Sequence, residues 1–421
     1  EFYGGAVSWG YVIRDRGPVV WARFDSVAAG ARPADLIQDT RSFRDALTDA
    51  AAPPVVTARE ARALWRDRMQ PLTAALAGAT DLVVVSSGEM AGIPVEALMD
   101  SSGAWLGDTY TISYTPSATI FAWLQERAKS REGELSASVL LVGDPPFNVV
   151  QRDFMAKEGA GDDLLAVAAV RSDTTLLRSA LSGNEEALSA LPRLQGTRAE
   201  VRAIGALAPG ADLLLGPAAT EQELVRLADS GELRSFGTIH LATHALIDQE
   251  NPERCALVLS QVDLPDPLTA ALAGERIYDG LVTTKEILQE WKLDADLVTL
   301  SACETALGKQ IWGEGTVGFA HAFLQAGARS LVESLWKVDD RATSLLMRRF
   351  YVNRWGRYSD ERNGRVGEPM MKAEALREAK RWLREYTDAG GRKPYAHPYF
   401  WSGFILLGAV MRRYTAGRGA A

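Results

Sequence analysis

The first third of the chain alternates between the apolar spacing of strands and the apolar spacing of helices. Alternating apolar residues flank a turn signal at Asp15–Pro18, and this pattern predicts a β-hairpin. Runs with apolar residues three and four positions apart predict amphipathic helices. The expected elements are a hairpin over residues 6–24, helices over 33–50 and 57–78, a short buried strand over Leu82–Ser86, an edge strand over Ile112–Tyr114 and a helix from Ser117.

Further along the chain, strands and helices follow one another in turn. This alternation favours an α/β fold with a mostly parallel sheet and helices on both faces. A linker is expected ahead of it, around Lys129–Ser136. The expected strands are Val139–Val142, Leu213–Leu215, Thr238–Ala242, Ala256–Leu259, Leu297–Leu300, Ser330–Leu335 and Phe404–Leu407. The expected helices are 197–208, 220–229, 283–290, 315–326, 340–352 and 372–386.

Composition bounds the class of protein more than its function. Of 421 residues, 47% are hydrophobic and 24% are charged, which is typical of a soluble globular protein. This length suits two units, or one large α/β domain with an appendage. A net charge of -8 without blocks of like charge argues against direct nucleic-acid binding. The first residues, Glu1-Phe2-Tyr3, lack an initiator Met, so we expect a piece cut from a longer protein.

Cysteine usage and hydropathy indicate the compartment. The two cysteines, Cys255 and Cys303, are too few for a disulfide framework or a cysteine-based zinc site, and they suit a reducing environment. No apolar run approaches the roughly 18 residues that span a bilayer, and the start of the chain does not resemble a signal peptide. We therefore expect a cytoplasmic protein without a membrane partner.

Two of the expected strands lead to residues that carry chemistry. Thr238–Ala242 runs toward His244, and Leu297–Leu300 runs toward Cys303, which lies 59 residues after that histidine. Sites in open α/β sheets form at the carboxyl ends of neighbouring strands, so the two side chains can face each other. A thiol with a pKa of about 8.5 is a poor source of thiolate at neutral pH, and an adjacent His can accept its proton.

Plainer interpretations of these residues stay open on pattern alone. A free Cys at a strand end is usually a small buried apolar residue, and a lone His is more often structural than catalytic. Cys255 has no His in comparable register and is interpreted as structural. His240 lies within its strand, where we expect it to pack or to support the site.

Several ordered motifs resemble the CHAT domain, a caspase-like peptidase family related to separase. The resemblance covers nearly the whole chain. The motifs are GIPVEALMD at 92–100, ISYTPSAT at 112–119, VGDPPF at 142–147, TIHLATHALID at 238–248, VTLSACETALGK at 298–309, GEGTVGFAHAFLQAGARSLVESLWKVDDRAT at 313–343 and HPYFWSGFILLG at 397–408.

The resemblance implies a degenerate caspase-like half over residues 1–133 and an active peptidase half over 134–421. It implies His244 as base and Cys303 as nucleophile, with no metal or organic cofactor. The family frequently has Gly after the His, where this chain has Ala245. The backbone N–H groups of Ala245 and Cys303 are then expected to hold the oxyanion. The implied partners are a protein substrate and an upstream sensor or repeat-domain regulator.

Acidic residues near the end of the strand Ser330–Leu335 suggest a substrate preference. Asp339 and Asp340, and less strongly Glu333, are candidates to bind a basic side chain before the cut, because carboxylates form charge-assisted hydrogen bonds with Arg and Lys. The alternative is that Asp340 is an ordinary helix N-cap.

The leading interpretation is a cysteine endopeptidase that processes a specific protein, in a setting that the resemblance implies is bacterial defence or cell death. Two alternatives remain: a caspase-like interaction module without catalysis, and another thiol hydrolase such as an amidase or acyltransferase.

Overall fold

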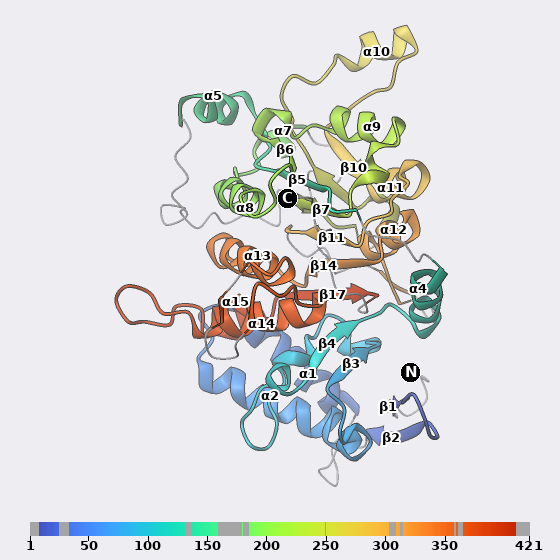
Figure 1. Cartoon of the computed structure of the whole chain (residues 1–421), viewed down its shortest axis with the longest axis vertical. Helices are drawn as coiled ribbons and strands as arrows, with labels where there is room; N and C mark the ends of the chain where they lie inside the picture. The colour runs from blue at the N-terminus through green and yellow to red at the C-terminus, as the bar shows by residue number, and fades with distance from the viewer. Residues whose placement is uncertain are drawn as a thin grey trace.

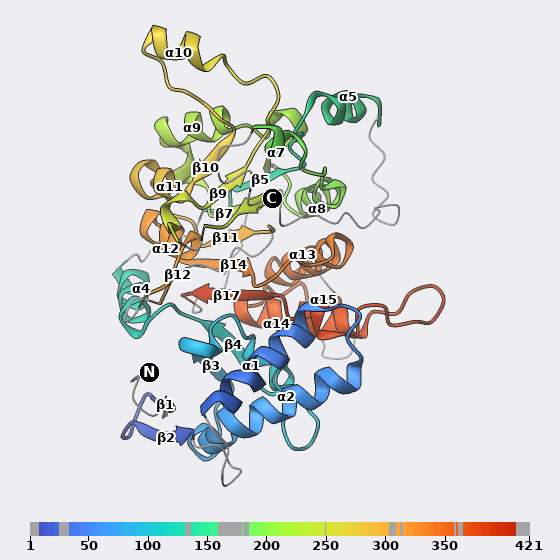
Figure 2. The ribbon, with the colours of Figure 1, turned by 180° about the vertical axis from the view of Figure 1, so that it is seen from behind.

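The computed structural model describes most of the chain. The described residues are 8–24, 33–130, 136–158, 179, 185–248, 250–302, 309–311, 315–357, 359–360 and 365–409. The predicted linker at Lys129–Ser136 falls largely outside them. The molecule is elongated, with the helices α1 (Pro33–Thr48) and α2 (Pro54–Arg68) side by side at one end and the short helix α10 (Pro267–Ala273) at the other (Figures 1 and 2).

One large sheet organises the fold and confirms the predicted α/β class. Its strand order is β3-β4-β17-β14-β11-β7-β5-β6. The strands are β3 (Asp81–Val84), β4 (Thr111–Tyr114), β17 (Phe404–Gly408), β14 (Ser330–Ser334), β11 (Leu297–Leu300), β7 (Thr238–Ala242), β5 (Val139–Gly143) and β6 (Asp212–Leu215). Among its neighbours, only β14 and β17 pair antiparallel, so the sheet is mostly parallel.

The antiparallel pair divides the sheet into two blocks of parallel strands. β6, β5, β7, β11 and β14 run one way, whereas β17, β4 and β3 run the other way. The last strand of the chain therefore joins two strands from its first third to the rest of the sheet. The division of the chain into units 1–133 and 134–421 stays a prediction.

The positions of β3 and β4 are the reverse of those predicted. β3 is the edge strand, and Val83 and Val85 are 40% and 39% exposed. β4 lies inside the sheet, where Ile112 and Tyr114 are buried. Both segments are short and apolar, and such runs do not reveal which strand acquires a second neighbour.

A second sheet carries the strand predicted over Ala256–Leu259. In its order β10-β9-β8, the strands β8 (His244–Leu246), β9 (Ala256–Val258) and β10 (Leu281–Thr283) pair antiparallel, so this segment is not part of the main sheet as predicted. Fewer than a dozen residues separate β8 from β9, which is too short for the crossover that joins parallel strands. Two further strands, β1 (Ser8–Val12) and β2 (Val20–Phe24), form the predicted N-terminal hairpin.

Helices cover both faces of the main sheet, as predicted. The helices of one face are α8 (Gln195–Gly205), α13 (Asp340–Arg354) and α14 (Lys372–Glu385), and those of the other are α9 (Glu221–Asp229), α11 (Thr284–Glu290) and α12 (Phe319–Ala326) (Figure 1). The remaining described α-helices are α3 (Leu106–Thr109), α4 (Ala118–Ser130), α5 (Val149–Glu158), α7 (Glu185–Ser189) and α15 (Pro398–Trp401).

Two predicted helices are shorter than expected. The helix over 57–78 gives way after Arg68 to a 3-10 turn at Gln70–Leu76, because Pro71 lacks the N–H that an α-helix needs. The helix over 315–326 begins only at Phe319, because Gly315–Val317 form the strand β13, paired with β12 (Lys309–Ile311). Within the described residues, every helix is too short or too polar to cross a bilayer.

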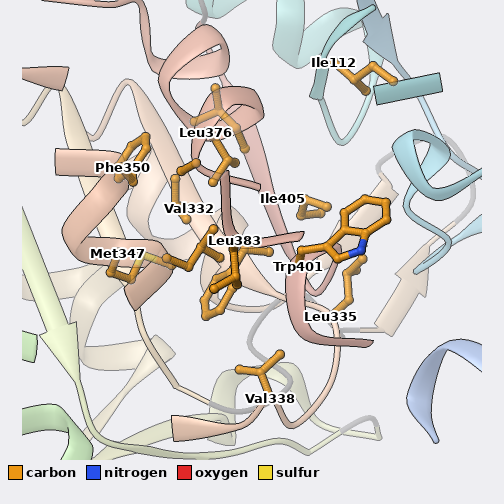
Figure 3. Packing of buried hydrophobic residues seen from close by; sticks show 14 of the residues in the cluster. Ile112, Val332, Leu335, Val338, Met347, Phe350, Leu376, Leu383, Trp401 and Ile405 are labelled. Carbon is orange, nitrogen blue, oxygen red and sulfur yellow. The ribbon is translucent and has the colours of Figure 1, made fainter. Parts of the chain in front are cut away.

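Each face of the sheet has its own apolar core. On the face of α13 and α14, buried side chains from both helices and from the strands pack together. Among the residues labelled in Figure 3, this packing is illustrated by Met347, Phe350, Leu376, Leu383 and Val332. The opposite core contains Phe323 from α12 and Leu300 from β11. Because β7 and β11 lie in the middle of the sheet between these cores, the segments that follow them begin from fixed positions.

Candidate active site

His244 is the first residue of β8, and only Thr243 separates it from the end of β7. Its Cα pairs with that of Val258 on β9, and the neighbouring Thr243 hydroxyl donates to the Val258 carbonyl. The imidazole is 0% exposed and packs against the ring of Phe147, with the ring centroids 5.1 Å apart. The second sheet therefore fixes the backbone of the histidine that the sequence singled out.

The hydrogen bonds of His244 define its tautomer. Nε2 lies 2.9 Å from the carbonyl oxygen of Pro192. A carbonyl can only accept, so Nε2 carries the proton and Nδ1 presents a lone pair. Within the described part of the chain, buried Nδ1 has no hydrogen-bond partner. The nitrogen that could accept a proton is thus the open one.

Burial lowers the pKa of His244 to about 4, against the opposing effect of its hydrogen bond to Pro192. The positive charge of Lys337 lowers the pKa of this imidazole further. Lys337 is half-buried in the segment after β14, where the hydroxyl of Tyr399 donates to its carbonyl over 2.9 Å. At neutral pH His244 is therefore an uncharged base.

The segment that leads to Cys303 is held on both sides, although Cys303 itself lies outside the described residues. The N–H of Ser301 donates to the carbonyl of Leu241 over 2.9 Å, which continues the pairing of β11 with β7. On the other side, the hydroxyl of Ser334 donates to the carbonyl of Ala302. The chain up to residue 302 is thus positioned between its neighbouring strands.

Ala245, predicted to help hold an oxyanion, is buried in β8 with its Cα paired to Leu257. Its oxyanion role, and that of the backbone of Cys303, stay predictions.

The three predicted substrate carboxylates lie in different surroundings. Asp339 caps α13, with Oδ1 accepting from the N–H of Ala342 over 2.9 Å, so Asp339 and not Asp340 is the N-cap. Asp340 is the first residue of α13, and its Oδ2 has no hydrogen-bond partner within the described chain. Burial, together with the negative charges of Asp339 and Glu200, raises the pKa of Asp340 to about 7. Its substrate role stays a prediction.

Glu333 lies inside β14 and is fully buried. Neither carboxyl oxygen has a hydrogen-bond partner among the described residues. Burial raises the pKa of Glu333 well above its usual range, which favours the neutral form of this carboxyl. A neutral Glu333 attracts a basic side chain less strongly than the ionised group the prediction assumed.

The sequence-based reasoning did not single out the functional interest of Asp144, which directly follows β5. Its fully buried carboxylate accepts two parallel hydrogen bonds from Arg193, with Nε to Oδ1 and Nη2 to Oδ2 both 2.8 Å. Arg198 donates through Nε to Oδ2 over 2.5 Å. Asp144 belongs to the VGDPPF motif, and an acidic residue at a strand end was the available signal. Its partners lie too far along the chain to be recognised from sequence.

His240 is packed inside the protein, which is one of the two roles expected for it. On β7 it is fully buried, with Nε2 2.8 Å from Glu200 Oε1 and Nδ1 3.3 Å from the Tyr351 hydroxyl. The Tyr351 hydroxyl also bonds to the hydroxyl of Thr299 on β11, at 2.8 Å. This network ties α8 and α13 to the two strands that lead toward the candidate site. Cys255, interpreted as structural, is buried and receives a hydrogen bond from the N–H of Asp248.

A family model described as the CHAT domain matches residues 58–409, which is most of the chain and includes all the candidate residues above. The chain belongs to the CHAT domain family. The resemblance noted in the sequence is thereby confirmed. Its mostly parallel sheet with helices on both faces is the α/β architecture expected from the sequence.

Similar solved structures include a Saccharomyces cerevisiae separase–securin complex, with 12% identity, coverage of 77% of this chain and 15% of that chain, and a TM-score of 0.40. Another is the Arg-specific cysteine proteinase gingipain R, with 8% identity, coverage of 90% and 75%, and a TM-score of 0.42. The family assignment does not depend on these partial overlaps.

Two curated relatives match a shorter part of this CHAT domain. Tetratricopeptide repeat protein 28 of Mus musculus is 32% identical over 133 residues, which is 31% of this chain and 5% of that protein. Its Homo sapiens counterpart is 28% identical over 132 residues, 31% of this chain and 4% of that protein. The match thus spans about a twentieth of the length of each relative.

Proposed function

We propose that this CHAT domain is a cysteine endopeptidase in which His244 is the base and Cys303 the nucleophile. One observation carries the proposal: His244 holds Nε2 against a carbonyl, and its buried, unprotonated Nδ1 has no hydrogen-bond partner among the described residues. An imidazole in this state can take a proton from a thiol without first losing one of its own.

The register of the sheet supports the choice of partner. On β11 and β7, Leu297 pairs with Thr238 and Leu300 with Leu241, an offset of 59 residues. Cys303 follows His244 by the same number of residues. The pairing of the two strands therefore has the same offset in residue number as the separation of His244 and Cys303.

The proposed reaction has two stages. Nδ1 of His244 takes the thiol proton while Sγ of Cys303 attacks the scissile carbonyl, and the N–H groups of Ala245 and Cys303 stabilise the oxyanion. The imidazolium then gives its proton to the leaving amine, which breaks the C–N bond and leaves a thioester. A water molecule, deprotonated by the imidazole, hydrolyses the thioester and restores the thiol. The negative thiolate offsets the cost of charging the buried imidazole.

A peptide-based thiol-reactive probe tests this function. We expect it to label the protein once, at Cys303, and labelling should disappear in Cys303→Ala and weaken strongly in His244→Gln. Cys255→Ala is the matched control, because that buried thiol should contribute no labelling or cleavage. Labelling that depended on Cys255 and not on Cys303 would overturn the assignment. A protein that cleaves nothing and ignores the probe would instead be the interaction module.

A basic residue before the cut is a further part of the proposal. Asp340 supports it best, because its Oδ2 has no hydrogen-bond partner among the described residues and its neutral form could ionise on meeting a cation. A peptide panel varied only at that position tests the preference. Equal cleavage of Arg, Lys, Gln and Glu peptides would contradict it.

Regulation by a repeat domain in bacterial defence or cell death completes the proposal. The names of the two curated relatives support the repeat-domain part, since both are tetratricopeptide repeat proteins. The defence setting rests on the family resemblance alone. Comparing new protein N-termini in cells that carry the wild type or Cys303→Ala would identify the substrate.

A further inference from the structure

Asp144 has an uncommon backbone conformation. Its φ is 53°, in the left-handed region that residues other than Gly enter rarely, although Asp tolerates it better than most. Its N–H donates to Oγ1 of Thr197 over 2.9 Å. The side chain is thereby directed into the protein, where both guanidinium groups meet it. An uncommon conformation of a buried residue can mark a functional constraint.

The two guanidinium groups belong to one segment, which runs from Pro192 into α8. Arg193 follows Pro192 directly, and its side chain is only 8% exposed. Its two parallel bonds to Asp144 fix both the position and the plane of the guanidinium. Further on, Thr197 Oγ1 donates to the carbonyl of Leu194 over 2.7 Å, and Arg198 binds Asp144 again. Asp144 thus anchors this segment at both ends of its turn.

A second tether connects the same two parts of the chain. The side chain of Gln151 donates to the carbonyl of Leu191 over 2.8 Å and accepts from the N–H of Phe147 over 2.8 Å. Phe147 is the residue whose ring packs on His244. The residues around Pro192 are therefore held to the segment after β5 on both sides of the carbonyl that His244 contacts.

We propose that Asp144 is a positioning residue, which through Arg193 holds the Pro192 carbonyl against Nε2 of His244 and so keeps Nδ1 open. Without a fixed acceptor at Nε2, the ring could turn or change tautomer, and Nδ1 would no longer be reliably the basic nitrogen. The catalytic meaning of this role rests on the proposed function. The tautomer itself does not, and it can be measured without any substrate.

The test compares Asp144→Asn with the wild type in protein labelled with 15N-histidine. The chain has four histidines, and His244→Gln assigns the signal of interest. In the wild type we expect a single Nε2–H tautomer, with a proton protected from exchange with water. In Asp144→Asn we expect that protection to fall at least tenfold and the tautomers to mix. Alkylation of Cys303 should slow by about tenfold as well, with kcat reduced and KM nearly unchanged.

Asp296→Asn is the matched control. Asp296 is also buried between two cations, Lys372 and Arg354, but it lies at the amino end of β11, away from the carboxyl ends of the strands. We expect this variant to keep the His244 proton protected and to keep the alkylation rate within twofold of the wild type. Arg193→Lys, which keeps the charge but not the paired geometry, should lie between the wild type and Asp144→Asn. It carries the test if Asp144→Asn does not fold.

Three outcomes are decisive. Unchanged proton protection in Asp144→Asn and in Arg193→Lys overturns the positioning role. An equal loss in Asp296→Asn also overturns it, because the effect would then be general destabilisation. A changed tautomer in a protein whose wild type cleaves no peptide and takes up no probe supports the positioning role and removes the proposed function.

Discussion

The two ends of the parallel strands differ in how burial acts on their titratable groups. At the amino edge, burial opposes ionisation of Asp296, but Lys372 and Arg354 overcome it and lower the pKa of that carboxylate. At the carboxyl edge, Asp144 is paired in the same way, but burial dominates at two other groups, lowering the pKa of His244 to about 4 and raising the pKa of Asp340 to about 7. Buried titratable groups whose pKa values are shifted in this way are candidates for chemistry.

The comparison also separates two buried carboxylates that look alike. Asp144 and Asp296 each contact two basic side chains and are nearly inaccessible. One lies in the chain of contacts to His244, and the other ties α13 and α14 to the start of β11. Their chemistry is the same, so location alone distinguishes a positioning role from a structural one.

Replacing the base should give the largest effect and is the strongest test of the carboxyl edge. In His244→Gln we expect the rate of peptide cleavage to fall about 10²- to 10⁴-fold, because proton transfer to Nδ1 is lost. Initial rates at saturating peptide, normalised to folded protein, measure it. A variant that retained a tenth of the activity would remove His244 from the mechanism.

Removing the paired carboxylate at the amino ends of the strands should lower the stability of the protein instead. In Asp296→Ala two buried cations lose their partner, and we expect the free energy of unfolding to fall by about 3–5 kcal/mol. Urea unfolding measures the loss, and the folded fraction should keep its cleavage rate. Loss of activity without loss of stability would contradict the structural role given to this edge.

Acid should act on stability through His244. Its pKa is about 4 in the folded protein, below the ordinary value near 6.5, so the unfolded chain binds a proton first as the pH falls. The protein therefore has its full stability, as far as His244 is concerned, above about pH 6.5. Between pH 6.5 and pH 4 it loses roughly 3 kcal/mol of unfolding free energy through this residue. The difference in unfolding free energy between the wild type and His244→Gln, followed across this range, reports it. A constant difference would show that His244 does not titrate as proposed.

Raising the pH should lower the stability of the protein through Asp340, by less than acid lowers it through His244. Its pKa is about 7 when folded and about 4 when unfolded, so its contribution is present below pH 4 and lost as the pH rises through 7. Asp340→Asn should therefore be more stable than the wild type at pH 8, by about 1–2 kcal/mol after allowing for its partial exposure, and should show no gain at pH 4. Thermal unfolding at both pH values measures this, and an equal shift at both would exclude titration as its cause.

The sequence predicted the strands toward His244 and Cys303 well, because β7 and β11 are continuous apolar runs buried on both faces. It could not predict that Ala256 would lie outside the main sheet, because an apolar run alone does not identify its partner strand. Asp144 was missed for a related reason. Arg193 binds it from 49 residues away, and a local reading of Asp before two prolines indicates only a turn.

The antiparallel strand β17 affects how the molecule can be made. Tyr114 on β4 pairs with Leu407 on β17. The strands β3 and β4, from early in the chain, therefore cannot join the main sheet until β17 has been synthesised. Until then β14 has one open edge, exposed to chaperones or to wrong partners. Contacts this distant in sequence form slowly. A nascent chain stalled before residue 404 should therefore hold the strands leading to His244 and Cys303 beside an unfinished sheet, and synthesis itself would delay completion of the candidate site.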